Sequence, residues 1–191
     1  MLIGSFIISL TPTKYQIYTR LVVSLILFFS MIRISRKEFD NIIEQINEVL
    51  DTGAFITAVV TFMIFAINIA LTFLSYTLFK QTTVNNNIIS MLYSKHPYIT
   101  GLIVILLLPF VEEILFKAQI FKNTKFLDNH KVIKTIIIAL LFACFHCITE
   151  IVNYILFYSI TNTIYIRSNY NIMKPIAIHM LLNALSLIIS L

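Results

Sequence analysis

Apolar residues are gathered along the chain into six long runs, separated by short polar stretches. The runs cover residues 17–34, 53–79, 98–121, 132–149, 151–166 and 175–191. About 20 helical residues cross roughly 30 Å of hydrocarbon, and most of the runs approach this length. They lack the period-two alternation of transmembrane strands. The pattern predicts an all-α, polytopic transmembrane helix bundle of about six spans, in which adjacent spans could merge into a hairpin or re-entrant pair.

Two N-terminal segments fall outside these runs. Residues 2–10 are apolar, but no basic residue precedes them, so we do not expect a cleaved signal peptide there. Residues 36–51 place apolar side chains at helical spacing between acids and amides. This segment is predicted to be an amphipathic helix, which either lies at the membrane surface or caps the bundle through protein contacts.

Composition supports a membrane location. Of the 191 residues, 59% are hydrophobic and 12% are charged, whereas about a quarter of a soluble domain is charged because its surface faces water. Most of this surface is therefore expected to face lipid. We expect one integral membrane domain, with N-terminal membrane helices in residues 1–97 and a core in residues 98–191.

Basic residues are concentrated in alternate loops. They are Arg33, Arg36 and Lys37 after the first run, Lys122, Lys125, Lys131 and Lys134 after the third, and Arg167 and Lys174 after the fifth. The positive-inside rule places these loops in the cytoplasm and both termini outside, although Lys14 and Arg20 weaken the bias. The net charge of +5 follows from these loops, and no basic face indicates a nucleic-acid partner.

The third run carries two adjacent acids, Glu112 and Glu113, which point about 100° apart on a helix. Lys117 follows Glu113 by four residues, in the order that favours an intrahelical ion pair. Glu112 then needs a partner on another helix, because an ionisable group inside a span costs about 2.5–3.5 kcal/mol. The alternative is that both acids reach toward headgroups at a helix end, although nine residues separate Glu112 from Lys122.

The fourth run places Phe142, His146 and Glu150 on one helix face at intervals of four residues. A lone histidine in an apolar helix is often a hydrogen-bonded structural residue, so structural and catalytic interpretations of His146 both stay open. Cys144 and Cys147 form a CxxC pattern around it, which is typical of redox or metal sites. Two cysteines inside a span are better explained as small packing residues.

The last run carries His179 and Asn183, which are four residues apart and share a helix face. Both side chains can donate hydrogen bonds toward one point, as stabilisation of an oxyanion requires. Interhelical hydrogen bonds that hold the bundle together explain this pair equally well. Taken together, a carboxylate, two histidines and an amide on three helices are the parts of a site that activates water for hydrolysis.

The order and spacing of these residues resemble the CPBP family of intramembrane proteases, also called the CAAX protease or Abi family. The family pattern EExxxR, FxxxH and HxxxN is matched by Glu112-Glu113-x-x-x-Lys117, Phe142-x-x-x-His146 and His179-x-x-x-Asn183. The resemblance covers about residues 98–191, which are then the expected catalytic core. Lys117 stands where the family has arginine. It offers a point charge in place of a planar fork, so we expect looser geometry around Glu113.

The resemblance implies that Glu112, assisted by His146, activates a water that attacks the scissile carbonyl. It also implies that His179 and Asn183 stabilise the oxyanion that forms. The supporting residues are Glu113 and Lys117, which position the first motif helix, and Phe142, which packs beside the site.

The family has been described both as zinc-dependent and as metal-free. Glu112, His146 and His179 could supply three zinc ligands and leave one position open, or they could act on water directly. The metal-free alternative is favoured, because Glu150 is the only evident carboxylate that could orient a ligating histidine.

The resemblance thus implies an intramembrane endopeptidase that cleaves a membrane-associated peptide or CAAX-like protein. The bias toward Ile, Asn, Lys and Phe suggests a bacterial cell membrane, with the site toward the cytoplasm. Family analogy then favours peptide maturation or bacteriocin immunity. One alternative is a non-catalytic immunity protein that binds a bacteriocin-like peptide. Another is a small transporter, which the local polar cluster disfavours because a path needs polar residues across the whole membrane.

Overall fold

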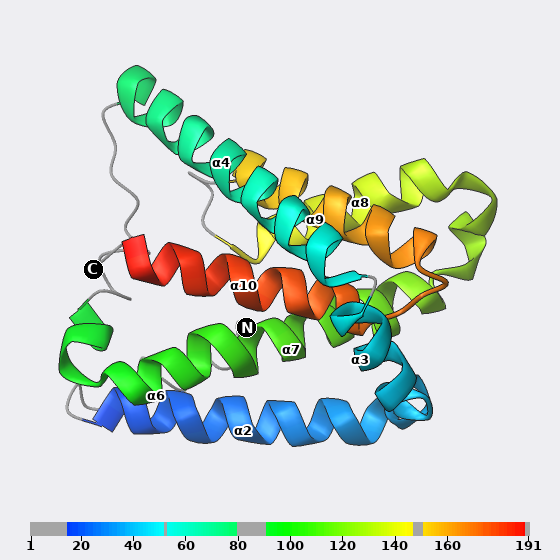
Figure 1. Cartoon of the computed structure of the whole chain (residues 1–191), viewed down its shortest axis with the longest axis horizontal. Helices are drawn as coiled ribbons and strands as arrows, with labels where there is room; N and C mark the ends of the chain where they lie inside the picture. Colours follow the sequence, from blue (N-terminus) through cyan, green and yellow to red (C-terminus); the bar gives the residue numbers. More distant parts are fainter. Residues whose placement is uncertain (1–14, 52, 80–90, 147–150, 190–191) are drawn as a thin grey trace.

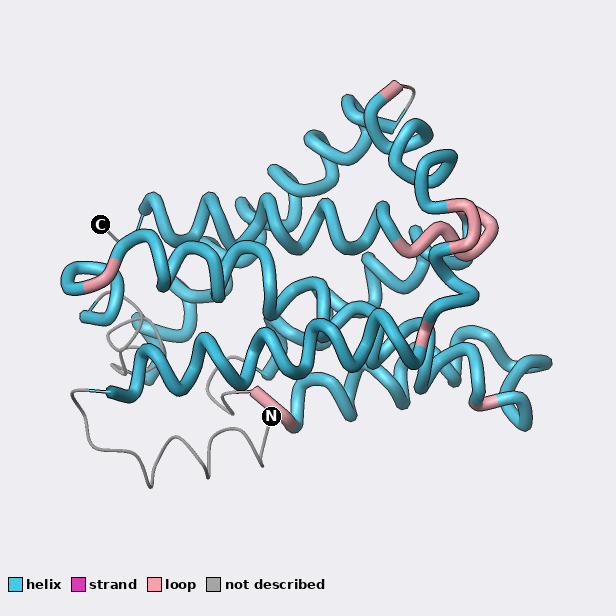
Figure 2. The backbone as a smooth tube through the Cα atoms, turned by 90° about the horizontal axis from the view of Figure 1, so that it is seen from below, coloured by secondary structure: helices cyan, strands magenta, loops and turns pink. Residues whose placement is uncertain are grey.

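The computed structural model describes residues 15–51, 53–79, 91–146 and 151–189, and the regular elements among them are all helical (Figures 1 and 2). This confirms the predicted all-α class. The α-helices are α2 (Gln16–Ile34), α3 (Ile42–Leu50), α4 (Gly53–Phe79), α6 (Pro97–Gly101), α7 (Leu108–Glu113), α8 (Lys131–Cys144), α9 (Ile151–Arg167) and α10 (Met173–Ile189). Shorter segments of other helical geometry are η2 (Arg36–Phe39), η3 (Leu102–Leu107), η4 (Ile114–Phe121) and η5 (Lys125–His130). Residues 2–10 lie outside the described residues.

Residues 97–121 form one helical path whose geometry alternates between α and π. The π-helical segments η3 and η4 lie on either side of the six-residue α7. Pro109 lies in the first turn of α7, and a proline in a helix interior removes a backbone hydrogen bond. Changes to π geometry are frequent at functional sites. This path presents Glu112 and Glu113 within one turn of the proline.

Within the described ranges, three helical stretches are long and apolar enough to cross a membrane, namely Gln16–Ile34, Gly53–Leu74 and Pro97–Phe121. Helix α8 has 14 residues, which span about 21 Å and fall short of the roughly 30 Å of hydrocarbon. Helices α8 and α9 pack along each other, and α8 begins at the end of the bundle where α9 ends (Figure 1). This arrangement resembles a re-entrant hairpin, so six complete crossings stay a prediction.

Helix α10 lies in the middle of the bundle, where it packs against α4, α7 and α9 (Figure 1). Helix α2 packs along η3 and α7 on the outer side of the 97–121 path. The hydrophobic core lies where this path meets α8, α9 and α10. Its fully buried side chains include Ile114, Ile138, Phe142, Tyr158, Tyr165 and Ile176.

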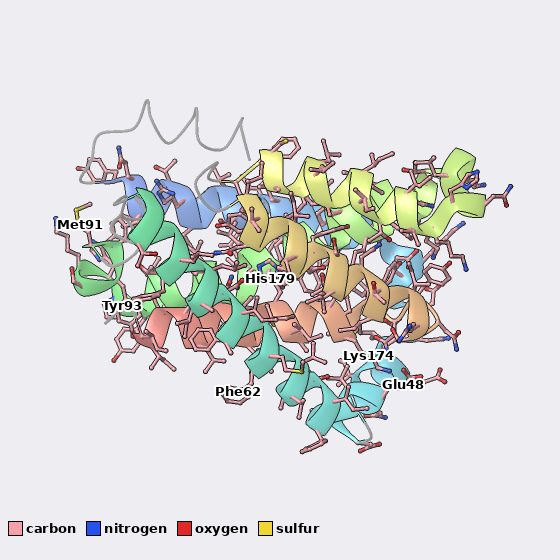
Figure 3. The ribbon with its side chains drawn as sticks, turned by 90° about the horizontal axis from the view of Figure 1, so that it is seen from above. Glu48, Phe62, Met91, Tyr93, Lys174 and His179 are labelled. Carbon is pink, nitrogen blue, oxygen red and sulfur yellow. The ribbon has the colours of Figure 1, made fainter. Side chains whose placement is uncertain are left out.

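The three loops predicted to be cytoplasmic meet at one end of the bundle (Figure 1). Lys122, after the third span, forms an ion pair with Glu38 at 2.6 Å. Lys174 follows the fifth span, and its Nζ lies 3.1 Å from Glu48 Oε2. The two residues are labelled side by side in Figure 3. Asn171 Nδ2 also donates to Glu48 Oε2 at 2.8 Å. These contacts join residues 36–51, which follow the first span, to the loops that follow the third and fifth spans.

Residues 36–51 differ from the single amphipathic helix that was predicted. Segment η2 ends at Phe39, and α3 begins at Ile42 after Asp40 and Asn41. Asp and Asn side chains compete with helical backbone bonds and favour such interruptions. Helix α3 packs against α4 and α10, and Gln45 Oε1 accepts the backbone N–H of Ile172, the residue before α10. Of the two interpretations, a cap on the bundle accounts for these contacts.

Candidate active site

The second acid of α7, Glu113, is completely buried and has two charged or polar partners. Lys117 Nζ lies 2.5 Å from Glu113 Oε2, one turn along the same helical path. His179 Nδ1, on α10, lies 2.9 Å from Glu113 Oε1. Because a carboxylate only accepts, Nδ1 carries the hydrogen and donates it. Glu113 therefore joins the first motif to α10 and orients the imidazole of His179, which lies inside the bundle in Figure 3.

The first acid, Glu112, faces two histidine rings on other helices. Glu112 Oε2 lies 3.8 Å from His146 Nε2 and 3.9 Å from His179 Nε2. The side chain of Glu112 is 11% exposed, and those of His146 and His179 are 12% and 9% exposed. The carboxylate thus lies in a mostly buried site that retains some access from outside. Each of the three motifs contributes one of these side chains.

His146 follows the end of α8, and a hydrogen bond and two aromatic contacts fix the orientation of its ring. Its Nδ1 lies 2.8 Å from the carbonyl oxygen of Phe142, so this nitrogen donates. In the neutral ring, Nε2 is then an acceptor that faces Glu112. The ring centroids of Phe142 and Tyr154 each lie 4.3 Å from that of His146. Phe142 therefore contributes both its carbonyl group and its ring.

Asn183 lies one turn after His179 on α10 and bonds across to the 97–121 path. Its Nδ2 donates to the carbonyl oxygen of Val104, in η3, at 2.9 Å. An amide nitrogen carries two hydrogens, so this bond leaves one for a second acceptor. The bond holds the amide group beside the path that carries Glu112.

Residues 94–185 match the family model described as Type II CAAX prenyl endopeptidase Rce1-like. The matched stretch contains all three motifs, and one side chain from each, namely Glu112, His146 and His179, lies at the site described above. Over this stretch the chain is similar to the CAAX protease family. This confirms the family resemblance that the motif spacing indicated. No curated protein and no solved structure matches the chain.

The family match and the three helices of the described residues that can cross a membrane identify the chain as an integral membrane protein. The description of the matching family model names an endopeptidase. The family model covers the stretch from α6 into α10. Helices α2, α3 and α4 lie before it and carry none of the motifs.

The donor atoms of this chain do not fit a zinc ion as they are arranged. Ligand atoms at about 2.0–2.2 Å from a tetrahedral zinc lie roughly 3.3–3.6 Å apart. Glu112 Oε2 lies further than this from both histidine nitrogens, at 3.8 and 3.9 Å. Among the described residues, no group of three or more His, Cys, Asp or Glu side chains has the spacing of a metal site.

The expectations for Glu150 and for the two cysteines can now be compared with the structure. The carboxylate that orients a histidine is Glu113, on His179, which the sequence argument overlooked when it considered Glu150. Glu150 and Cys147 lie outside the described residues. Cys144 is a free and exposed cysteine, which places it on the surface of α8.

Sequence reasoning assigned no role to α9, yet this helix lines the site. Its contacting residues recur at helical spacing and are Tyr154, Phe157, Tyr158 and Thr161. Phe157 meets the ring of His179 edge-on, at 4.7 Å between centroids. The signal in the sequence is an aromatic and hydroxyl stripe on one helix face. Such a stripe is also typical of an ordinary core, so it could not be singled out before the packing was known.

Proposed function

We propose that this chain is an intramembrane endopeptidase in which Glu112, assisted by His146, activates water to hydrolyse a peptide bond. The supporting observation is the convergence of Glu112 Oε2 with the Nε2 atoms of His146 and His179, at 3.8 and 3.9 Å. These gaps are too long for direct hydrogen bonds. A water oxygen about 2.8 Å from Glu112 Oε2 and His146 Nε2 bridges them with good geometry.

Hydrolysis then requires one proton to move from water to the leaving amine. Glu112 accepts that proton while the water oxygen attacks the carbonyl carbon, and the carbonyl electron pair moves to its oxygen. The neutral Nε2 of His146 holds the water in line as an acceptor. When the tetrahedral intermediate collapses, the C–N bond breaks. The proton passes from Glu112 to the leaving nitrogen, and Glu112 returns to its ionised form.

The oxyanion faces His179 and Asn183 in this proposal. Donation from His179 Nε2 requires a hydrogen on both ring nitrogens, because Nδ1 already donates to Glu113. The Nε2–H of His179 then donates to the oxyanion, as does the second amide hydrogen of Asn183. Donors that are held in place before the reaction stabilise such a charge most effectively, and both residues are anchored through their other polar atoms.

The proposed substrate is a membrane-associated peptide or a CAAX-like protein. It would reach the site from the end of the bundle where the three basic loops meet, which the positive-inside rule assigns to the cytoplasm. The residue bias of the chain favours a bacterial cell membrane as its location. Prenylated C-terminal peptides and bacteriocin-like peptides are both candidate substrates, because both are membrane-associated peptides.

The test compares peptides in membranes from cells that express wild-type, Glu112→Gln or Glu44→Gln protein at equal levels. Glu44 is an exposed acid on α3, so its variant controls for the loss of a carboxylate elsewhere. We expect cleavage products with wild-type and Glu44→Gln protein that are absent with Glu112→Gln. Identical peptides from all three, with a protective phenotype that survives Glu112→Gln, would overturn the proposal. That outcome would favour a non-catalytic immunity protein.

A further inference from the structure

We propose that Tyr158 and Thr161 of α9 form a clamp that is specific for lysine at position 117, and that Thr161 is a positioning residue of the peptidase site. The effect on cleavage rests on the proposed function, whereas the effect on stability does not. The inference concerns the one motif position that departs from the family pattern. It also gives α9 a role that none of the three motifs includes.

The ammonium group of Lys117 has three contacts in three directions. Its Nζ lies 2.5 Å from Glu113 Oε2, 3.1 Å from Thr161 Oγ1 and 4.1 Å from the centroid of the Tyr158 ring. An ammonium has three hydrogens and no acceptor, and Thr161 accepts one of these hydrogens while the carboxylate of Glu113 and the Tyr158 ring face its charge. The side chain of Lys117 is completely buried, and each missing contact would leave a buried donor unsatisfied.

The clamp residues are themselves held in position by other contacts. The Thr161 hydroxyl donates its own hydrogen to the carbonyl oxygen of Tyr158 at 3.2 Å, which turns its lone pairs toward Lys117. The Tyr158 ring stacks on Phe142, with centroids 4.9 Å apart. Thr161 therefore acts as an acceptor of fixed direction, and Tyr158 as a fixed face for a cation. Both residues are completely buried.

Arginine would not fit this clamp as lysine does. Its guanidinium is planar and has five donors, and the buried space beside Glu113 is filled by the Tyr158 ring and Thr161. A larger side chain in a closed site forces its neighbours out of position, and extra donors remain unsatisfied. The lysine is therefore matched to α9, and the looser geometry expected from the sequence is not what surrounds it.

The clamp acts on the site through one chain of contacts. Thr161 positions Lys117, Lys117 positions Glu113, and Glu113 holds the Nδ1–H of His179. A shift of the ammonium toward Glu113 or away from it moves the carboxylate that orients this imidazole. Loss of the Thr161 acceptor should therefore affect the chemical step, while substrate binding stays nearly unchanged.

The test uses full-length protein in detergent or proteoliposomes and the substrate peptide found with wild-type protein. Thr161→Val keeps the shape and removes the acceptor, and Thr161→Ser restores the acceptor. Thr163→Val is the matched control, because Thr163 is an exposed residue of α9 whose hydroxyl bonds to Ser159 of its own helix. We expect Thr161→Val to lower kcat roughly tenfold with KM within about twofold. Thr161→Ser and Thr163→Val should stay within about twofold of wild type.

Lys117→Arg tests the specificity for lysine. Although it restores the family motif, we expect it to lower kcat roughly tenfold, and the added Thr161→Ala substitution should recover part of this loss by making space. Lys117→Arg protein that cleaves as fast as wild type, with the same unfolding midpoint, would overturn the specificity. Equal kcat and equal midpoints for Thr161→Val and Thr163→Val would overturn the clamp.

Thermal unfolding separates failure of the clamp from failure of the proposed function. If wild-type protein cleaves no peptide, the proposed function fails. The clamp still predicts lower unfolding midpoints for Thr161→Val and Lys117→Arg than for Thr161→Ser and Thr163→Val. Failure of Thr161→Val to fold, while Thr161→Ser and Thr163→Val fold, also supports the clamp.

Discussion

Glu113 accepts the Nδ1–H of His179 at 2.9 Å through one carboxylate oxygen, while its other oxygen binds Lys117. This single buried side chain links the first motif to the third. Its neighbour Glu112 is 11% exposed, and its contacts with His146 and His179 are longer, at 3.8 and 3.9 Å. The two adjacent acids are therefore expected to differ in how they respond to mutation.

Glu113→Gln should destabilise the fold as well as abolish cleavage. The substitution leaves the buried Lys117 ammonium without its counter-charge, and breaking a buried pair costs about 3–5 kcal/mol. Glu112→Gln should abolish cleavage and leave the unfolding midpoint nearly unchanged. Unfolding in detergent, measured on equal amounts of both variants, tests the contrast. Equal midpoints for the two variants would contradict it.

A double variant separates the two consequences of losing Glu113. Glu113→Leu with Lys117→Leu removes both charges, and such replacements often restore the stability of a buried pair. We expect a midpoint near that of wild type but no cleavage, because the imidazole of His179 has lost its acceptor. Cleavage by this folded variant would show that Glu113 is not needed to orient His179.

Asn183→Leu should lower kcat by about 10²–10³-fold, the effect of removing one oxyanion donor in other hydrolases. KM should change little, since the amide is expected to bind the oxyanion only in the transition state. The bond from Asn183 to Val104 is also lost, so folding is checked by the unfolding midpoint. A kcat within about threefold of wild type in the folded variant would remove Asn183 from the site.

Tyr154→Leu should reduce kcat by roughly tenfold, whereas Tyr154→Phe should retain most of the activity. The aromatic ring packs 4.3 Å from the ring of His146, where it fixes the plane of the imidazole. A ring contact of this kind is worth about 0.5–1.5 kcal/mol, which corresponds to a loss of up to about tenfold. Kinetics of the two variants at saturating peptide test the role of the ring. Equal losses in both would assign the effect to the hydroxyl group.

Acidification should weaken the attachment of α3 to α10. The pKa of Glu48 lies below its ordinary value of 4.5, first because Asn171 donates a hydrogen bond to the carboxylate and then because Lys174 is close to it. A lowered pKa means that the ionised form favours the folded state. The stabilisation is therefore complete above about pH 4.5 and is lost as the pH falls below that value.

The measurement is the unfolding midpoint in detergent between about pH 7 and pH 3, across the titration of a carboxyl group. Part of the decrease seen with wild-type protein should be absent in Glu48→Gln and fully present in Glu44→Gln. The effect should be small, because the side chain of Glu48 is 49% exposed and water screens its charge. Identical pH profiles for wild type and Glu48→Gln would contradict the prediction.

Chelation should leave cleavage unchanged. The oxygen of Glu112 lies too far from the two histidine nitrogens to share a tetrahedral zinc ion with them. The check is the cleavage rate after incubation with 1,10-phenanthroline, with its non-chelating 1,7 isomer as the control. A loss seen only with the chelator, and reversed by added zinc, would show that the three side chains rearrange around a metal.

The sequence by itself determined the membrane class, the three long apolar helical stretches and the three motifs. Apolar runs at 17–34, 53–79 and 98–121 correspond to α2, α4 and the path from Pro97 to Phe121. Length and hydropathy depend only on neighbouring residues, so they can be read before any packing is known. The pairing of Glu113 with Lys117 is equally local, because residues four apart share a helix face.

Sequence reasoning failed where a residue's partner lies on another element. It considered Glu150 as the carboxylate for a histidine and overlooked Glu113, whose intrahelical partner seemed to account for its charge. It also continued one helix through Asp40 and Asn41, because the apolar period persists across them. In the first case the local pattern was correct and left out a contact made across the bundle. In the second, the apolar period hid the tendency of Asp and Asn to interrupt a helix.

The tertiary structure alone decided which side chains surround Glu112, that Asn183 is anchored to η3, and that α9 holds the lysine of the first motif. Thr161 lies 44 positions from Lys117 in the chain, and His179 lies 66 positions from Glu113. Such contacts depend on how the helices pack and turn against one another. No local period encodes that arrangement, because the same apolar faces can pack in more than one register.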